Sequence, residues 1–365
     1  MKSFSVHGAP SEYIFSEGVL EQLQSKLIER GLKKVLIVHG VKSWEAAKPF
    51  WPELNDIEVE EYVYGGECSL SEIDKVANLV EENSFDGVIA VGGGKVLDLV
   101  KATCNQTHRQ AILVPTLPSN CSPWAAVSVL YDDAGTFIRY DVYPVSASLV
   151  LIEPRILIDA PVSMLIAGIG DTLAKWYEAD VQMSGIDNKP VPLQISYFAA
   201  KQCKDLLLQH SKGAISAAKA GQLNDDFMKV VETIITMAGL VGGFGDYYGR
   251  VAAAHSIHNG LTILEETHHA LHGEKVAYGI LVQLVLEGKW DEIEQLIPIY
   301  RDWGLPISVS EIGVQNLTQD MITAVAQKAV IPEESIHVMP MEITAEKVAS
   351  AISELENKVA VLNYS

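Results

Sequence analysis

The sequence predicts an α/β protein in two parts, a parallel β-sheet covered by helices followed by an all-helical region. Over the first 150 or so residues, short β-branched runs alternate with longer amphipathic segments. After about residue 160, apolar residues recur at helical spacing and strand-like runs become scarce. The 365 residues also exceed what one hydrophobic core usually serves. We therefore expect two domains, spanning residues 1–160 and 161–365.

The elements of the first domain follow one another in strand–helix order. We expect strands at 33–40 (KKVLIVHG), 86–94 (DGVIAVGGG) and 110–116 (QAILVPT). Helices are expected at 71–83 (SEIDKVANLVEEN) and 95–104 (KVLDLVKATC). This order predicts a Rossmann-like parallel sheet with helices on both faces.

The second domain is predicted to be helical, with helices in 161–182, 225–243 and 345–362. We find no internal repeat, low-complexity run or Gly/Ser-rich linker between the two halves. The halves are therefore expected to pack closely and to share a cleft, which is where ligands usually bind.

The composition narrows the class of partner. Lys and Arg number 27 against 47 Asp and Glu, a net charge of −20, which argues against nucleic acid and acidic membrane surfaces and favours a small-molecule ligand. Residues 1–18 lack the apolar core of a signal peptide, and no window approaches about 18 uninterrupted apolar residues, so we expect a cytoplasmic protein. The four cysteines form no CxxC pair and are expected to be reduced and mostly buried.

A run of three glycines, 92–94, joins a predicted strand to a predicted helix that carries Lys95 and Asp98 in its first turn. Glycine lets the backbone approach a ligand, and the free N–H groups of a helix start suit a phosphate, so we interpret the run as a pyrophosphate cradle. The run matches neither GxGxxG nor the P-loop, and a tight turn is the alternative interpretation. At the end of the next strand, Thr116 and Ser119 are placed to hydrogen-bond a nicotinamide or its ribose.

Five of the ten histidines lie within residues 252–279. His255 and His258 are three apart, and His268, His269 and His272 fall within about one helical turn. Any of these pairs has a spacing suited to a metal, and a divalent ion usually needs a carboxylate or another imidazole from elsewhere in the fold. Spacing alone does not choose among the pairs.

Several motifs in order carry a family resemblance: GGGKVLDLVKA (92–102), VPTLPSN (114–120), AGIGDTLAKWYEA (167–179), AAAHSIHNGLT (252–262) and HGEKVAYG (272–279). Together they resemble the iron-containing alcohol dehydrogenase superfamily, specifically its glycerol-dehydrogenase-like branch, from about residue 8 to ESIHVMP near residue 340. The resemblance implies the fold shared with dehydroquinate synthase, a metal-dependent NAD(P)(H) oxidoreductase activity and a homo-oligomer.

The same resemblance implies that the metal ligands are Asp171, His255 and His272, which leave coordination positions open for a substrate oxygen. His258, His268 and His269 are then helix-surface residues or residues behind the ligands. Long-chain relatives carry a fourth ligand, a His, where this chain has Lys175. A protonated lysine cannot ligate a metal, so Zn²⁺ is favoured, with Fe²⁺ or another divalent ion as alternatives.

The cofactor implied by the resemblance is NAD or NADP. NAD-specific relatives carry an acidic residue at the end of the strand expected at 33–40, whereas this chain has His39-Gly40-Val41-Lys42, which allows NADP(H). The residues implied to bind the cofactor are Gly40, Gly93, Gly94, Lys95, Asp98, Thr116, Ser119, Val127 and Tyr131.

Two positions bear on the substrate. Cys121 stands where glycerol dehydrogenases place an Asp that holds the polyol, and Trp124 stands where they have a small residue. A less acidic, more crowded pocket favours anionic substrates, because a repulsion beside the metal is removed. These features resemble the hydroxycarboxylate dehydrogenase subgroup, so we expect interconversion of a small 2-oxo acid and its 2-hydroxy acid. Oxidation of glycerol or another small alcohol is the alternative.

Two further interpretations assign the chain to a class of protein other than a dehydrogenase. A dehydroquinate-synthase-like cyclase would share the glycine run but use a Glu as first ligand and several basic residues for a substrate phosphate. Few such residues lie near the motifs here, the main ones being Lys175, Arg250 and Lys275. A non-enzymatic nucleotide sensor would predict a lost ligand or a broken glycine run, and both are intact.

Overall fold

A computed structural model of the protein describes residues 4–363. Its N-terminal half is built on a six-stranded sheet of order β1-β8-β5-β4-β2-β3, in which every neighbouring pair is parallel. This confirms the predicted parallel sheet, and β1, β3 and β8 extend it beyond the three strands expected. The strands are β1 (Tyr13–Phe15), β2 (Lys34–His39), β3 (Glu58–Val63), β4 (Gly87–Gly92), β5 (Gln110–Pro115) and β8 (Leu149–Ile152).

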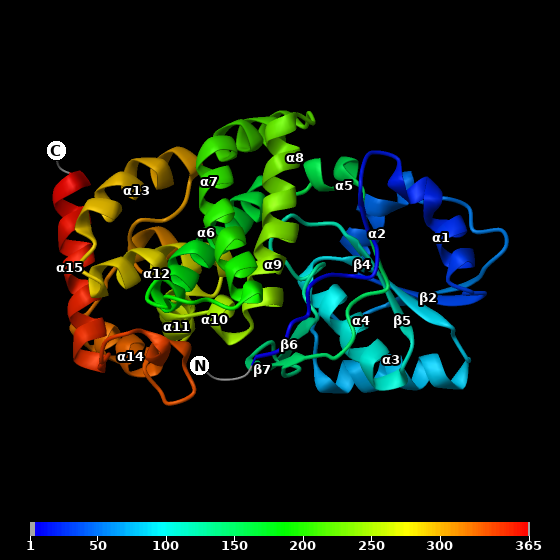
Figure 1. Cartoon of the computed structure of the whole chain (residues 1–365), viewed down its shortest axis with the longest axis horizontal. Coiled ribbons are helices and arrows are strands. Elements are labelled where there is room, and N and C mark those ends of the chain that lie inside the picture. Colours follow the sequence, from blue (N-terminus) through cyan, green and yellow to red (C-terminus); the bar gives the residue numbers. More distant parts are fainter. Residues whose placement is uncertain (1–3, 364–365) are drawn as a thin grey trace.

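Helices cover both faces of the sheet (Figure 1). Side chains alternate between faces along each strand. Val35 and Ile37 of β2 accordingly pack in the core cluster that includes α1 (Leu23–Glu29) and α2 (Val41–Ala47). Leu36 and Val38 pack in the cluster that contains α3 (Leu70–Glu82) and α4 (Gly94–Thr107). That second cluster continues into the helical half, so a shared core joins the two halves.

An antiparallel hairpin that the sequence analysis missed follows β5. It consists of β6 (Val127–Tyr131) and β7 (Phe137–Val142). Asp98 of α4 anchors it: the Asp98 carbonyl accepts from Ser128 Oγ at 2.7 Å, and its carboxylate accepts from the Val129 N–H at 2.9 Å.

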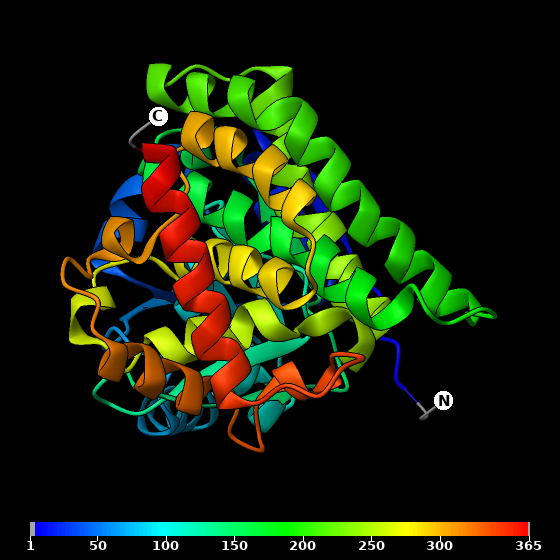
Figure 2. The same cartoon turned by 90° about the vertical axis from the view of Figure 1, so that its left-hand side faces the viewer.

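The second half is helical, as predicted, and α15 lies across its outer end in Figure 2, where it packs on α12 and α14. The predicted boundary at residue 160 falls between α5 (Pro154–Ile158) and α6, and it stays a prediction. The remaining α-helices are α6 (Val162–Met183), α7 (Val191–Ala220), α8 (Asp225–Glu232), α9 (Ala238–Gly245), α10 (Tyr247–Arg250), α11 (Ala253–Leu261), α12 (His272–Leu286), α13 (Trp290–Trp303), α14 (Gln319–Ala329) and α15 (Ala345–Asn363). The short helical turns are η1 (Val19–Gln22), η2 (Lys48–Phe50), η3 (Thr233–Met237), η4 (Glu265–Thr267), η5 (Val309–Ile312) and η6 (Ser335–Val338).

One stretch within residues 4–363, Asp225–Gly245, is long and apolar enough to cross a membrane by length and composition. Half of its most apolar window is buried inside the helical half. The stretch also changes from α-helix to a π-helical turn at Thr233–Met237 and back again.

Candidate metal centre and nucleotide cradle

The glycine run forms the turn between β4 and α4, and the loop after β5 crosses directly over it. A Cβ added at Gly93 would lie 2.8 Å from Leu117 Cδ1, and one at Gly94 would lie 3.0 Å from Asn120 Nδ2. The Thr116 N–H donates to the Gly92 carbonyl at 3.0 Å, which fixes the two strand ends side by side. The close approach requires glycine, and the start of a fourteen-residue helix beside it suits a pyrophosphate.

The side chains of Lys95, Asp98 and Tyr131, which the resemblance implies bind the cofactor, contact other side chains of the protein. Lys95 Nζ lies 2.5 Å from Glu67 Oε1 and 5.2 Å from the centre of the Tyr131 ring. The buried carboxylate of Asp98 accepts from Ser122 Oγ at 2.6 Å, and it pairs with Lys101 at 2.9 Å. Asp98 therefore holds the loop and the hairpin together, and a direct contact between it and a cofactor stays a prediction.

Lys101 is a framework residue that the sequence analysis missed. Its buried ammonium donates to the carbonyls of Ser122, Ala125 and Val127, at 2.8, 3.0 and 2.5 Å. These bonds fix the loop that runs from Ser119 to the predicted cofactor residue Val127. A lysine in the second turn of an amphipathic helix carries no sequence signal for such a role.

The end of β2 carries charges of both signs. His39 is buried, stacks on Trp44 with 4.8 Å between ring centres, and has Nε2 3.5 Å from Glu61 Oε2. A Cβ added at Gly40 would lie 3.2 Å from the Tyr64 ring. Lys42 is exposed at the start of α2. Glu61, on the neighbouring strand β3, is an acidic residue near this edge that the sequence analysis did not consider.

Asp171, His255 and His272 meet in space, although the first and the last are 101 positions apart in the sequence. His255 Nε2 and His272 Nε2 each lie 3.4 Å from Asp171 Oδ1, and one ligand atom from each residue falls within 4.8 Å of the others. Asp171 and His255 are largely enclosed, whereas half of the His272 side chain is exposed. The cluster is therefore open on the His272 side.

Glycines bring the three helices close enough to form this cluster. A Cβ at Gly273, next to His272 on α12, would lie 1.8 Å from the Ala167 carbonyl oxygen of α6, and one at Gly170 would lie 2.6 Å from the Gly273 oxygen. A Cβ at Gly279 would similarly lie 2.3 Å from the Ala254 oxygen of α11. Backbone therefore packs on backbone beside each ligand.

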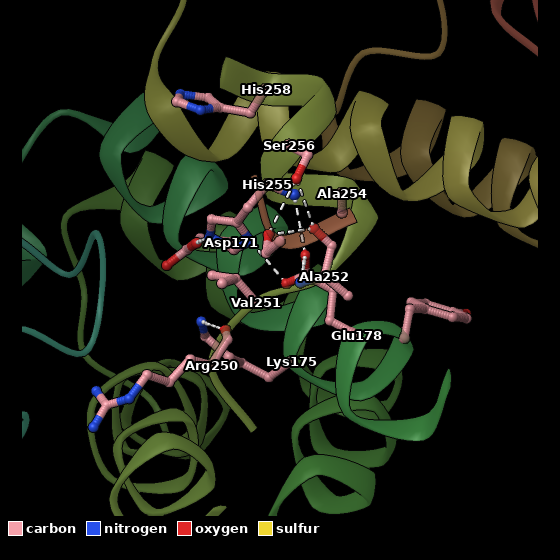
Figure 3. A network of polar contacts seen from close by, with 12 residues as sticks. Asp171, Lys175, Glu178, Arg250, Val251, Ala252, Ala254, His255, Ser256 and His258 are labelled. Carbon is pink, nitrogen blue, oxygen red and sulfur yellow. Dashed lines mark hydrogen bonds and ion pairs between the residues drawn. The ribbon is translucent and has the colours of Figure 1, made fainter. Parts of the chain in front are cut away.

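Glu178, one further residue that the sequence analysis missed, orients His255 (Figure 3). Glu178 Oε2 lies 2.7 Å from His255 Nδ1, and Oε1 accepts from the N–H groups of Ala252 and His255 at 2.7 and 3.0 Å. A carboxylate accepts hydrogen bonds, so the network places a proton on His255 Nδ1 and leaves Nε2, which faces Asp171, as the nitrogen that can bind a metal. Glu178 lies seven residues after Asp171 on α6, so both side chains lie on the same face of that helix.

His258 supports His272 in the same way. His258 Nε2 lies 3.0 Å from His272 Nδ1, and His258 Nδ1 lies 2.9 Å from Asn259 Oδ1, whose amide group donates to Glu334 at 3.0 Å. Burial, together with the nearby His272, lowers the pKa of His258 well below its usual range. A neutral His258 with its proton on Nδ1 accepts from His272 Nδ1–H, which leaves His272 Nε2 free to ligate.

His268 and His269 lie outside the cluster. His268 is exposed and its Nε2 lies 2.9 Å from the Thr262 carbonyl oxygen, whereas His269 packs beside Gly313.

The electrostatics of the cluster suit a cation. Burial alone would raise the pKa of Asp171, but the adjacent imidazoles of His255 and His272 hold it well below the usual range. Burial alone would lower the pKa of His255, but the Glu178 and Asp171 carboxylates outweigh this effect and raise the pKa to about 9. Asp171 Oδ1 is buried without a hydrogen-bond partner. Two imidazole nitrogens and one carboxylate oxygen without a hydrogen-bond partner form a set of ligand atoms that suits Zn²⁺ and other divalent ions.

The two predicted substrate residues lie at the junction of the halves. Cys121 is partly buried, and the charges of Lys175 and Asp171 both act on its thiol. Trp124 is 9% exposed and is packed against Gly239 of α9, while its indole N–H donates to the Gly8 carbonyl at 2.9 Å. These are the contacts of a packing residue, and a substrate contact by Trp124 stays a prediction.

The cradle and the metal cluster adjoin each other. A Cβ at Gly168, three residues before Asp171, would lie 2.3 Å from the Pro118 carbonyl oxygen in the loop over the glycine turn. A nucleotide cradle beside a three-ligand metal cluster, where an α/β half meets a helical half, is the arrangement of a metal-dependent dehydrogenase.

Comparison with known proteins gives the family. The sequence profile of iron-containing alcohol dehydrogenase matches residues 10–154. Hydroxycarboxylate dehydrogenase A of Escherichia coli K12 is 36% identical over 351 residues, which cover 95% of this chain and 96% of that protein. Glycerol dehydrogenase of Citrobacter freundii is 37% identical over 306 residues, 82% of each chain. The crystal structure of a probable glycerol dehydrogenase from Sinorhizobium meliloti 1021 matches with a TM-score of 0.88 at 30% identity, over 98% of this chain and 100% of that one.

The chain belongs to the iron-containing alcohol dehydrogenase family. It is therefore an oxidoreductase of a metal-dependent and NAD-dependent family, and the predicted resemblance is confirmed.

Proposed function

We propose that this enzyme interconverts a small 2-oxo acid and its 2-hydroxy acid, with a nicotinamide cofactor in the glycine cradle and a divalent ion, Zn²⁺, held by Asp171, His255 and His272. A bound divalent ion supplies Lewis acidity toward the carbonyl oxygen of the substrate or the alkoxide oxygen of the product. The protein's own groups orient the ligands: Glu178 fixes the His255 tautomer.

The observation that carries the choice of substrate is the uncharged side chain of Cys121 beside the cluster. Burial raises the pKa of this thiol, so it is neutral at physiological pH and adds no negative charge next to Asp171. A carboxylate there would repel an anionic substrate in a partly desolvated pocket. The similarity to hydroxycarboxylate dehydrogenase A supports the same choice. Oxidation of glycerol is the second candidate, because several similar proteins are glycerol dehydrogenases.

The proposal also covers the cellular location, the oligomeric state and the cofactor of the enzyme. The enzyme acts in the cytoplasm as a homo-oligomer on a small molecule, without nucleic-acid or membrane partners. It accepts NADPH as well as NADH, because residues 40–42 present Lys42 and no carboxylate, although Glu61 lies on the adjacent strand. Size-exclusion chromatography with light scattering measures the oligomeric state directly.

The test is the initial rate of NADH and NADPH consumption by zinc-loaded enzyme with 2-oxobutanoate, 2-oxoglutarate and dihydroxyacetone. We expect the oxo acids to be reduced, and we expect His272→Ala to abolish the reaction. Much faster reduction of dihydroxyacetone would make the enzyme a glycerol dehydrogenase and refute the argument from Cys121.

A further inference from the structure

Lys175 is a buried cation next to the metal cluster with too few partners. It lies one helical turn after Asp171 on α6 and is 8% exposed. Its Nζ makes one hydrogen bond in the described part of the chain, to the Arg250 carbonyl oxygen at 3.2 Å, and no carboxylate there lies within 4.0 Å of it (Figure 3). An ammonium group has three N–H donors, and a buried charge is normally paired.

A second buried lysine shows what full pairing looks like in this protein. Lys101 is 5% exposed, donates to three carbonyl oxygens and one hydroxyl, and pairs with Asp98 at 2.9 Å. Lys175 is buried to a similar extent, but it donates to only one carbonyl oxygen and has no paired carboxylate among the described residues. The difference indicates that a partner from outside the chain completes its contacts.

The surroundings keep Lys175 charged. Burial lowers its pKa, but the negative charges of Asp171 and Glu178 raise the pKa above its ordinary value overall. Glu178 is already engaged with His255, and Asp171 faces the two imidazoles. Neither carboxylate is within pairing distance of the ammonium group.

The charges of the site favour a monoanion. With a divalent ion bound and both imidazoles neutral, Asp171, Glu178 and Lys175 leave a net charge of +1. A monocarboxylate substrate brings this sum to zero in a site where burial makes uncompensated charge costly. Side chains four residues apart on a helix lie about 5–6 Å apart at Cβ, so one small molecule could reach both Lys175 and a metal that Asp171 would help to hold.

We propose that the Lys175 ammonium group binds the carboxylate of the substrate and thereby gives the enzyme its preference for 2-oxo acids over neutral ketones. This inference rests on the proposed function of the same site, because it identifies the residue that recognises the acid group. Lys175 is a substrate-binding residue, and Cys121 removes a competing negative charge from the same pocket.

The experiment compares wild-type enzyme with Lys175→Met and with Lys175→Gln, which keeps an N–H donor for the Arg250 carbonyl while removing the charge. Lys204→Met is the matched control, because Lys204 is a partly buried lysine of the helical half that pairs with Glu292. Calorimetry measures the binding of oxamate, an unreactive analogue of a 2-oxo acid, to the zinc-loaded enzyme with NADH. Rates are measured with 2-oxobutanoate and with dihydroxyacetone, and zinc content and thermal unfolding are recorded for each variant.

We expect both Lys175 variants to bind oxamate at least roughly 30-fold more weakly, the scale seen when one partner of a buried charge pair is truncated. The value of kcat/KM for 2-oxobutanoate should fall by a similar factor, whereas that for dihydroxyacetone should stay within about threefold. Lys204→Met should match the wild type in both binding and rates.

Unchanged oxamate binding in the folded Lys175→Gln protein would overturn the inference, as would an equal loss with both substrates. If wild-type enzyme reduces 2-oxo acids and Lys175→Gln does so equally well, the proposed function stands and the inference fails. If wild-type enzyme reduces only dihydroxyacetone but binds oxamate through Lys175, the proposed function fails and the anion site stands. Absence of oxamate binding to the wild type overturns both.

Discussion

Replacing Glu178 with glutamine tests how the protein prepares its metal ligands. The two backbone N–H groups of Ala252 and His255 require an oxygen acceptor, so the amide oxygen of the introduced side chain is expected to face them. The amide NH₂ group then faces His255 Nδ1 and donates to it. That arrangement moves the imidazole proton to Nε2, the atom that must be free to bind metal.

The size of the effect follows from the contact that is lost. A hydrogen bond to a charged group contributes about 1.5–3 kcal/mol. Since about 1.4 kcal/mol is a factor of ten, the Kd for zinc should rise roughly 10- to 150-fold. This range agrees with the effect of about 10- to 100-fold that is typical when the partner of a metal-ligating histidine is changed.

Competition with a fluorescent zinc chelator measures the Kd, and circular dichroism checks folding. Glu292→Gln is the control, because Glu292 accepts from the hydroxyl of Tyr177, the neighbour of Glu178, at 2.6 Å and lies outside the metal cluster. The control should bind zinc as the wild type does. Zinc affinity in Glu178→Gln equal to that of the wild type would refute the tautomer argument.

Three further substitutions test the cradle, its framework and the cofactor edge. Gly94→Ala places a Cβ 3.0 Å from Asn120 Nδ2, where the backbone must approach a pyrophosphate. The KM for the cofactor should therefore rise on the order of tenfold. An unchanged KM would show that the phosphates bind elsewhere. Lys101→Met leaves the buried Asp98 unpaired, so the free energy of unfolding measured by urea titration should fall by about 3–5 kcal/mol. A loss below about 1 kcal/mol would contradict the structural role assigned to Lys101. Lys42→Glu adds a negative charge at the end of β2 and should lower kcat/KM for NADPH roughly tenfold with little change for NADH; equal effects on both cofactors would show that residue 42 does not face the 2′ position.

The sequence was most informative where a pattern is local. Short continuous apolar runs predicted β2, β4 and β5, because these strands are buried on both faces of the sheet, and amphipathic segments predicted α3 and α4. The hairpin β6–β7 was missed, since β7 is largely exposed and so lacks the alternation of a half-buried strand. The three ligands were identified through the family resemblance, because the five clustered histidines satisfy helical spacing in several ways.

The supporting residues were not predictable in the same manner. Glu178 acts on a histidine 77 positions away, and Lys101 acts on carbonyl groups at least 21 positions away. Both sit on helices whose local pattern is satisfied by any polar residue at that position. Their roles depend on how helices and loops distant in sequence come together, and only the packed structure contains that information.

The glycine contacts between α6, α11 and α12 make the geometry of the metal ligands independent of the side chains that determine substrate preference. The spacing of Asp171, His255 and His272 is set by main-chain atoms touching one another, so exchanging nearby side chains leaves it intact. Cys121 and Lys175 lie beside the cluster without taking part in those contacts. Substrate preference can therefore diverge through one or two substitutions while the metal centre is inherited unchanged, which makes these two positions the natural starting points for redesigning the enzyme toward other carbonyl compounds.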